Sequence, residues 1–325
     1  MLKFPFRQAG AQDGVTGICE HPDGLGVVHL KRREGERPQV TVCRFIEARR
    51  EQDRTALLQE AIRLHGLGRS RCVGVMGVGN YSLLQVDPPE VPEEEISSAV
   101  CWHIRDLIDY PVEEAIIDYF LVPNPAQPGR AKMAYVVAAP RVQVRNRAAL
   151  LRAARLKVSA MDIPELVLRN LATLLPEEER GLALLQLGRH RGQITISRGG
   201  VLYLARSISV GAADLAEIAA EGDGQSAEEA GYRLQGMLDS IVLEIQRSLD
   251  FYGSSFSLPA IQSLVVAPLE QEVPRLTEYL ADYLGISVRR LDLAALFEGA
   301  ALSPLDQARC LPAFGAALRD VEGAP

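Results

Sequence analysis

Short apolar runs typical of strands alternate along this chain with amphipathic segments of helical spacing. In the first quarter one segment, residues 55–64, has helical spacing, and four runs are strand-like: 26–30, 39–45, 72–78 and 81–86. The dipeptide Gly79-Asn80 separates the last two runs and suits the positive φ angles of a tight turn, so we expect a hairpin there. Because strand and helix patterns keep alternating in the rest of the chain, the sequence predicts the α/β class.

Residues 87–163 read as a small α/β unit set between larger pieces. The polar, proline-containing stretch 87–92 breaks the pattern before it, and three glutamates at 93–95 open a helix whose dipole they favourably face. Apolar residues recur at helical spacing as far as Ile108, and Tyr110-Pro111 ends this helix. Four further elements are expected in the order strand, strand, helix and strand: 115–122, 133–139, 148–156 and 158–163.

The second half of the chain begins with a helix and a β-meander. Pro164 suits the first turn of the helix, and the charged stretch 176–181 follows it. The polar, acidic stretch 220–231 predicts a mobile loop. The expected elements of this half are the meander strands 182–187, 193–197 and 201–207, the long helix 233–252, a strand at 263–267, a helix at 273–284, a strand at 286–291 and a closing helix at 308–318.

Composition and charge narrow the function classes. The chain has 325 residues, of which 47% are hydrophobic and 24% charged, as in ordinary globular proteins. Its 35 Lys and Arg against 42 Asp and Glu give a net charge of −7, which argues against sequence-independent nucleic-acid binding but permits a local basic patch. The five cysteines are scattered singly, which fits a reducing compartment.

The hydropathy pattern predicts no membrane segment. Residues 1–7 lack the uninterrupted apolar core of a signal peptide. No apolar run approaches the roughly 18 residues of a membrane span. We therefore expect a cytoplasmic protein that reaches a membrane only through a partner.

The usual catalytic motifs are missing from the sequence, which contains neither GxxxxGK[ST] nor HExxH nor GxSxG. The five histidines are scattered, so we expect no metal site. Residues 74–79, which read GVMGVG, resemble a glycine-rich phosphate loop. A strand and not a helix is expected after them, so the helix N-terminus that would hold a phosphate is missing.

Two places allow both a structural and a functional interpretation. The turn that carries Arg189 and Arg191 between two predicted strands is either an exposed basic turn or an anion site. Trp102 is the only tryptophan and lies beside the apolar stripe of the 93–108 helix. It is either a core residue or an anchor for a partner peptide, since buried aromatic anchors dominate interface energetics.

Several segments, in their order along the chain, resemble the PilM family of type IV pilus assembly proteins. The resemblance extends from about residue 70 to about residue 320, and within the family it is greatest to the MshI members, which serve the mannose-sensitive haemagglutinin (MSHA) pilus. The segments that carry it are 93–111 followed by 113–122, 162–172 (DIPELVLRNLA), 244–252 (EIQRSLDFY) and 312–319 (PAFGAALR).

The resemblance implies an actin-like, ribonuclease H-like α/β fold of two lobes, similar to the cell-division protein FtsA, with a small inserted α/β subdomain. On that basis residues 1–86 form the core of the first lobe, with 164–180 and the helix 308–318 packing back onto it. Residues 87–163 are the inserted subdomain, and residues 181–307 form the second lobe.

The resemblance also implies a role and a partner. Members of the family lie on the cytoplasmic face of the inner membrane and bind the N-terminal tail of a single-span protein, linking it to the pilus assembly platform and its motor. For this chain the partner would be PilN-like, or MshJ-like in an MSHA system, with no nucleic acid involved. The tail lies in a cleft at the inserted subdomain, which places Trp102, Tyr110 and Pro111 at the predicted partner site. Whether the chain forms a homodimer stays open.

At the ATP site of the family this chain departs from the pattern. The first phosphate hairpin resembles Asp-Ile-Gly-Ser in relatives, whereas residues 15–19 here read VTGIC. The second begins with an aspartate, whereas residues 186–190 read QLGRH, and residues 267–272 (APLEQE) replace the adenosine-side glycines. Neutral Gln186 cannot replace the carboxylate that helps to organise Mg²⁺. We therefore expect no enzyme activity and no cofactor.

Two alternative functions remain at this stage. The degenerate hairpin of Gly188, Arg189, Arg191 and Gly192 could still bind ATP, which would make the chain an ATP-binding PilM-like switch protein. The chain could instead be a cytoplasmic platform component of type II secretion, although those relatives usually continue into a membrane span.

Overall fold

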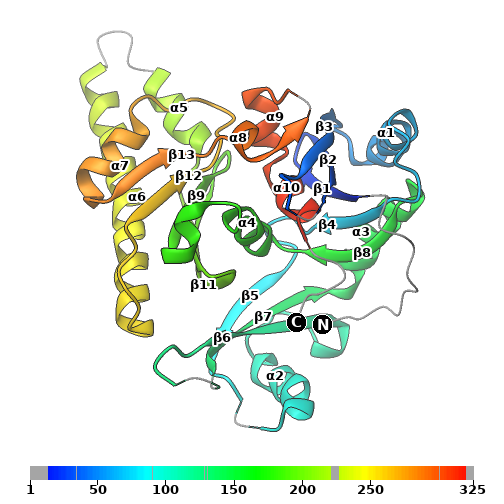
Figure 1. The fold of residues 1–325 in the computed structure, drawn as a ribbon, viewed down its shortest axis with the longest axis horizontal. Coiled ribbons are helices and arrows are strands. Elements are labelled where there is room, and N and C mark those ends of the chain that lie inside the picture. The colour runs from blue at the N-terminus through cyan, green and yellow to red at the C-terminus, as the bar shows by residue number, and fades with distance from the viewer. Residues whose placement is uncertain are drawn as a thin grey trace. The chain divides into compact units, whose positions relative to one another are not determined.

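The computed structural model describes residues 14–33, 35–89, 91–127, 129, 131–220, 227–299 and 301–319. Residues 1–7 and the central part of the predicted loop at 220–231 lie outside these ranges. The chain divides into two compact units (Figure 1). The first unit comprises the chain up to Val167 together with the segment from Pro312 onward, and the second unit comprises Leu168–Leu311.

The first unit is built on a mixed sheet in which the strand order is β3-β2-β1-β4-β8. Strands β1, β2 and β3 form an antiparallel meander, and β4 and β8 add to β1 in parallel. Two helices, α1 and α3, pack their apolar sides on this sheet. The bounds are β1 Val15–His21, β2 Gly24–Lys31, β3 Gln39–Glu47, α1 Glu51–Leu64, β4 Arg71–Val75, α3 Arg141–Ala153 and β8 Lys157–Asp162.

A three-stranded antiparallel sheet of order β5-β7-β6 branches from the first unit between β4 and α3. Val100 and Ile104 of α2 are fully buried against Val136 and Ala138 of β7, so one helix covers one face of this small sheet. The bounds are β5 Ser82–Val86, the 3₁₀ turn Glu93–Glu95, α2 Ile96–Ile104, the 3₁₀ turn Val112–Glu114, β6 Ala115–Pro123 and β7 Ala131–Pro140.

The second unit repeats the plan of the first. Its five-stranded sheet has the order β11-β10-β9-β12-β13, with an antiparallel meander followed by two parallel strands. The long helix α6 packs against β11, α5 and α7. The bounds of the sheet strands and of the helices between them are β9 Leu182–Leu187, β10 Gly192–Arg198, β11 Val201–Ile208, α5 Ala212–Ala220, α6 Ala227–Phe256, β12 Ser263–Val266, α7 Leu276–Leu284 and β13 Ser287–Arg290.

Short elements complete the chain. Helix α4 begins at Pro164, as the sequence predicts, and carries the chain from one unit into the other. The remaining bounds are α4 Pro164–Ala172, the 3₁₀ turn Pro176–Arg180, α8 Leu293–Leu296, β14 Glu298–Gly299, α9 Pro304–Arg309 and α10 Leu311–Ala317. Within the described residues, no helix combines the length and the hydrophobicity that crossing a bilayer requires.

The predicted hairpin at Gly79-Asn80 is wrong. Gly79 does adopt a positive φ of 89°, but the strands on either side of it belong to different sheets. Both edges of β4 are occupied by β1 and β8, so β5 pairs with β7 instead. The turn therefore redirects the chain out of the main sheet.

Strand pairing divides the chain differently from the predicted boundaries of the inserted subdomain at 87 and 163. Strand β5, which lies before residue 87, belongs to the small sheet, whereas β8, which lies before residue 163, belongs to the main sheet. The second unit begins at Leu168, so it also takes up most of the stretch 164–180. The boundaries of the subdomain depend on which distant strands pair with each other. Breaks in the local sequence pattern do not reveal this pairing.

Candidate functional site

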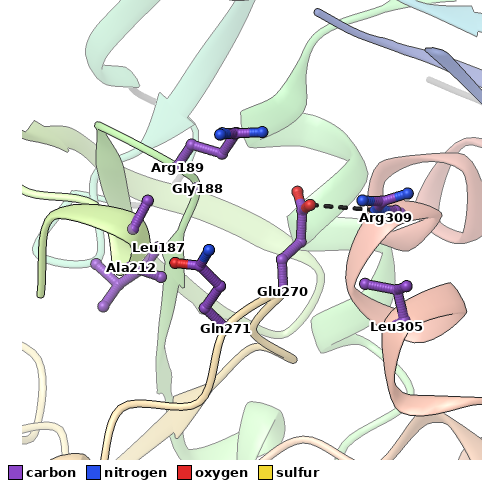
Figure 2. Close-up of a pocket in the computed structure, with 9 residues that line it drawn as sticks. Leu187, Gly188, Arg189, Ala212, Glu270, Gln271, Leu305 and Arg309 are labelled. Carbon is purple, nitrogen blue, oxygen red and sulfur yellow. Dashed lines mark hydrogen bonds and ion pairs between the residues drawn. The ribbon is translucent and has the colours of Figure 1, made fainter. Parts of the chain in front are cut away.

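The turn between β9 and β10 borders a hollow in the second unit. The hollow has a volume of about 130 Å³ and is lined by three short segments and one helix (Figure 2). The lining residues are Leu187, Gly188 and Arg189 of the turn, Ala212 and Ala213 at the start of α5, Glu270 and Gln271 after β12, and Leu305 and Arg309 of α9. Small-molecule sites usually have about 300–1,000 Å³, so this hollow by itself is too small to enclose a nucleotide.

The backbone of the turn is hydrogen-bonded to the N-terminus of α5. The amide of Ala212 donates to the carbonyl oxygen of Gly188 over 2.7 Å, and the amide of Ala213 donates to that of Arg189 over 2.9 Å. The amide of Gly188 in turn donates to the carbonyl oxygen of Arg191 over 2.8 Å. These helix N-terminal amides, which in other proteins bind phosphate, are therefore already used by the turn.

Gly211 and Asp214 fix this contact. A Cβ atom at Gly211 would collide with the carbonyl group of Arg189 and the amide nitrogen of His190, so only glycine permits the approach. Asp214 accepts hydrogen bonds from the Gly211 amide over 2.9 Å and from His190 Nδ1 over 2.6 Å. Burial tends to raise the pKa of Asp214, but the bonds from His190 and Gly211 outweigh it and hold that pKa below its ordinary value.

An ion pair lies in the hollow. Arg309 Nε is 3.2 Å from Glu270 Oε2, and both side chains are about one-fifth exposed, at 19% and 21%. Figure 2 shows this pair beside the turn that carries Arg189. Of the two glutamates in the stretch 267–272, Glu270 lines the hollow, whereas Glu272 pairs with Arg290 and is not among the lining residues. The hollow beside this turn is therefore lined by a glutamate that is already paired with an arginine.

The four predicted residues of the hairpin are neighbours in space, but only two reach the hollow. Gly188 and Arg189 line it, whereas Arg191 is exposed and Gly192 is the first residue of β10. A Cβ at Gly192 would lie 2.6 Å from Leu187 Cδ2 and 3.0 Å from the carbonyl oxygen of Gln186. Strand packing is therefore a sufficient reason for glycine at this position.

Trp102 lies on the solvent side of α2. Its residue exposure is 71%, which excludes the interpretation as a core residue. The guanidinium carbon of Arg105 lies 5.8 Å from the centre of the indole ring, a cation–π distance. Trp102 is thus an exposed aromatic side chain on a helix whose opposite side is anchored in the small sheet.

Tyr110 and Pro111 lie after α2 and before the 3₁₀ turn Val112–Glu114. The hydroxyl of Tyr110 is buried and has no hydrogen-bond partner among the described residues. Burial, and to a smaller extent the neighbouring Asp109, raises the pKa of this hydroxyl. No ring contact joins Tyr110 to Trp102 in the described part of the chain.

A second polar cluster, which the sequence analysis did not single out, lies in the first unit where β8 passes into α4. The Tyr81 hydroxyl donates to Glu165 Oε2 over 2.7 Å, and Asp162 pairs with Arg319 over 2.8 Å. Burial raises the pKa of Glu165; the Tyr81 hydrogen bond lowers it in part, and the charge of Asp162 raises it further. Charged residues at the end of a parallel strand were the available signal in the sequence, since a ligand in an α/β protein often binds at such an end.

The topology defines a class of protein. Two units that each combine an antiparallel meander with two parallel strands, with a small sheet inserted in the first, make up an actin-like α/β protein. A family model described as type IV pilus assembly protein PilM matches residues 85–319, well over half of the chain. This chain therefore belongs to the PilM family and has a role in type IV pilus assembly.

Solved structures agree with this fold. A structure of a PilM–PilN type IV pilus biogenesis complex matches with a TM-score of 0.72 and 21% identity over 95% of this chain and 99% of that one. An actin-like protein of unknown function from Bacteroides thetaiotaomicron matches with a TM-score of 0.48 and 9% identity over 87% and 93% of the two chains. The cytoplasmic domain of EpsL, from the type II secretion system of Vibrio cholerae, matches with a TM-score of 0.45 and 11% identity over 83% and 94%.

The last two similarities are too weak to support a functional argument. No curated protein matches this chain.

Proposed function

We propose that this chain acts in pilus assembly as a binding component that catalyses no reaction and holds the N-terminal tail of a single-span inner-membrane protein. The matched PilM structure is a complex with PilN, which supports a PilN-like partner. In an MSHA pilus system that partner would be MshJ-like. The partner would place this chain at the cytoplasmic face of the inner membrane, beside the assembly platform and its motor.

The observation that carries this proposal is the state of the β9–β10 turn. The α5 amides that could have bound phosphate donate to the carbonyl oxygens of Gly188 and Arg189. The neighbouring hollow contains the Glu270–Arg309 pair and has a volume of only about 130 Å³. A polyanion entering it would meet the carboxylate of Glu270 and would have to displace a partly buried ion pair, which is costly.

The partner is expected to bind at α2. An exposed tryptophan on a well-anchored helix is the side chain that most often becomes a hot spot when a partner covers it. Tyr110, whose hydroxyl is buried and unpaired among the described residues, follows α2 in the chain and is expected to border the same interface. Pro111 fixes the chain next to this hydroxyl, so both residues could contribute to the same interface.

The test uses a synthetic peptide with the N-terminal tail sequence of the cognate single-span pilus protein. We expect isothermal titration calorimetry to show binding to the full chain and Trp102→Ala to weaken it at least about tenfold, as loss of a hot-spot residue does. Tyr232→Ala is the matched control, because Tyr232 is an equally exposed aromatic residue on α6, at 69%. If folded protein binds no peptide, or if the Tyr232 variant loses as much affinity, the proposal is wrong.

A second candidate, the ATP-binding switch, is favoured by one observation. The amides of Arg189 and His190 have no hydrogen-bond partner among the described residues, and Arg189 and Arg191 supply positive charge beside them. Such free amides in a turn can bind an anion. This candidate requires a nucleotide to bind one conformation more tightly than another.

A further inference from the structure

Positive charge is concentrated in one part of this acidic chain. Although Asp and Glu make up 42 of the 325 residues, residues 119–161 contain eight Lys and Arg and no acid at all. Residues 54–72 contain four Arg and only one acid, Glu60. These two stretches lie far apart in the sequence.

The fold joins the two stretches at the C-terminal ends of α1 and α3. Both helices contribute to one apolar core on the same face of the main sheet, and they contact each other. Gln59 Nε2 donates to the carbonyl oxygen of Ala153 over 3.0 Å, and the amide of Arg69 donates to that of Arg155 over 2.8 Å. The segment after α1 therefore lies against the segment after α3.

We call the cations gathered here the basic surface. All its members are exposed, and none has an acidic partner within the described ranges. They are Arg63, Arg69, Arg152, Arg155 and Lys157. Arg147, in contrast, is tied to Glu20 and does not count among them.

Helix capping explains only part of this arrangement. Arg63 and Arg152 lie in the last turns of their helices, where a cation favourably faces the helix dipole. Arg69 and Arg155 lie beyond the helices with φ angles of 71° and 61°, in the left-handed region that glycine occupies at much lower cost. Both positions thus present an exposed cation from a backbone conformation that glycine would adopt at lower cost.

An exposed leucine distinguishes between the possible binding partners of the basic surface, an acidic protein segment and a bilayer. Leu64, at the end of α1 directly after Arg63, is 64% exposed. An acidic protein segment would bind the cations and would make no use of the exposed leucine. A bilayer would interact with the cations and with the leucine, because cations bind its anionic head groups while an apolar side chain enters the region beneath them.

We propose that the basic surface docks directly on a bilayer that contains anionic phospholipid. This contact goes beyond the binding of a partner tail and adds to it. A weak tail complex and a weak lipid contact on one molecule reinforce each other, since the second contact forms at a high effective concentration. Because the rest of the chain is acidic and repelled by such a bilayer, the contact also orients the molecule.

The test is co-sedimentation of the full chain, without any partner, with vesicles of phosphatidylglycerol and phosphatidylcholine or of phosphatidylcholine alone. We expect binding only to the anionic vesicles, and a decrease as salt is raised. The double variant Arg69→Gly, Arg155→Gly should weaken binding on the order of 30-fold, given the contribution of each cation near an anionic surface. Glycine suits both φ angles, so this variant is expected to fold.

A control variant removes the same charge elsewhere. Arg275 also has a left-handed φ, of 58°, and Arg247 is exposed on α6, so Arg275→Gly with Arg247→Gln has the same net charge as the test variant. It should keep wild-type binding. Leu64→Ser should weaken vesicle binding several-fold without changing its salt dependence.

Three results would overturn the proposal: no difference between the two vesicle types, equal losses in the test and control variants, or an effect of the test variant on an acidic peptide or RNA but none on vesicles. The last of these would assign the basic surface to a protein or nucleic-acid partner. Peptide binding by the same variants is expected to stay unchanged, so failure of the lipid contact is distinguishable from failure of the proposed function.

Discussion

At the scale of single residues, backbone contacts decide which side chains are allowed at the candidate site. Gly211 touches the backbone of Arg189 and His190 so closely that it has no room for a Cβ atom. The sequence analysis singled out the glycines on the turn, Gly188 and Gly192, because family resemblance pointed there. It missed Gly211, since the partner segment that makes this glycine necessary is distant in the pattern and near only in the fold.

Gly211→Ala is expected to lower the free energy of unfolding by about 1–3 kcal/mol, as overpacking of a close contact does. Chemical denaturation measures this loss. Gly236→Ala is the control, because Gly236 lies in α6 and a Cβ atom added there would meet nothing within 4 Å. That change should stabilise the protein by about 0.5–1 kcal/mol, since alanine is the better helix former. Equal stability of the Gly211 variant and the wild type would contradict the close contact.

At the scale of elements, one carboxylate connects a strand and two helices of the first unit. Glu20 of β1 accepts hydrogen bonds from Arg54 of α1, over 3.0 Å, and from Arg147 of α3. Arg54 also donates to the carbonyl oxygens of His21 and Pro22, over 2.6 and 2.9 Å. Burial raises the pKa of Glu20, and the two guanidinium groups lower it in part.

Glu20→Ala should destabilise the protein by about 3–5 kcal/mol, because it leaves two mostly buried cations without their counter-charge. The side chains involved are only 9%, 9% and 17% exposed, so solvent screens them little. Denaturant titration of the full chain measures the effect. Glu244→Ala is the comparison, since its pair with Arg247 is exposed and should contribute less than about 1 kcal/mol. If Glu20→Ala loses no more stability than Glu244→Ala, the ion pairs of Glu20 with Arg54 and Arg147 do not stabilise the fold.

A comparison of predicted and observed elements shows how many of them the local sequence pattern predicts. The sequence predicted the β9–β10–β11 meander, the strands β12 and β13, and the long helix α6, which begins at Ala227, earlier than expected. It gave no expectation for β1 or α5. Helix α5 is short and directly precedes the acidic stretch that reads as a loop, so its apolar residues do not form a clear helical pattern.

At the scale of the whole molecule, the repeated topology is an actin-like fold, and that fold alone does not show that the chain uses ATP. The hollow beside the β9–β10 turn has a volume of about 130 Å³ and contains the Glu270–Arg309 ion pair. The charge distribution is uneven at this scale, because an acidic chain carries one concentrated basic surface.

We expect millimolar ATP with Mg²⁺ to leave the melting temperature of the protein unchanged. A ligand at 100 times its dissociation constant would stabilise the folded state by about 2.7 kcal/mol, a shift that thermal melting detects easily. Sulfate at matched ionic strength is the control for a simple anion effect at Arg189 and Arg191. A clear rise with Mg·ATP that sulfate does not reproduce would favour the ATP-binding switch.

The sequence by itself determined the α/β class, most of the elements and the family, because periodicity and motif order are local properties of the chain. Only the tertiary structure decided which strands share a sheet, that Trp102 is exposed, that Gly211 supports the β9–β10 turn, and that the arginines following α1 and α3 meet on one surface. Each of these depends on contacts between residues that are distant in the sequence, and such contacts are fixed only when the whole hydrophobic core packs.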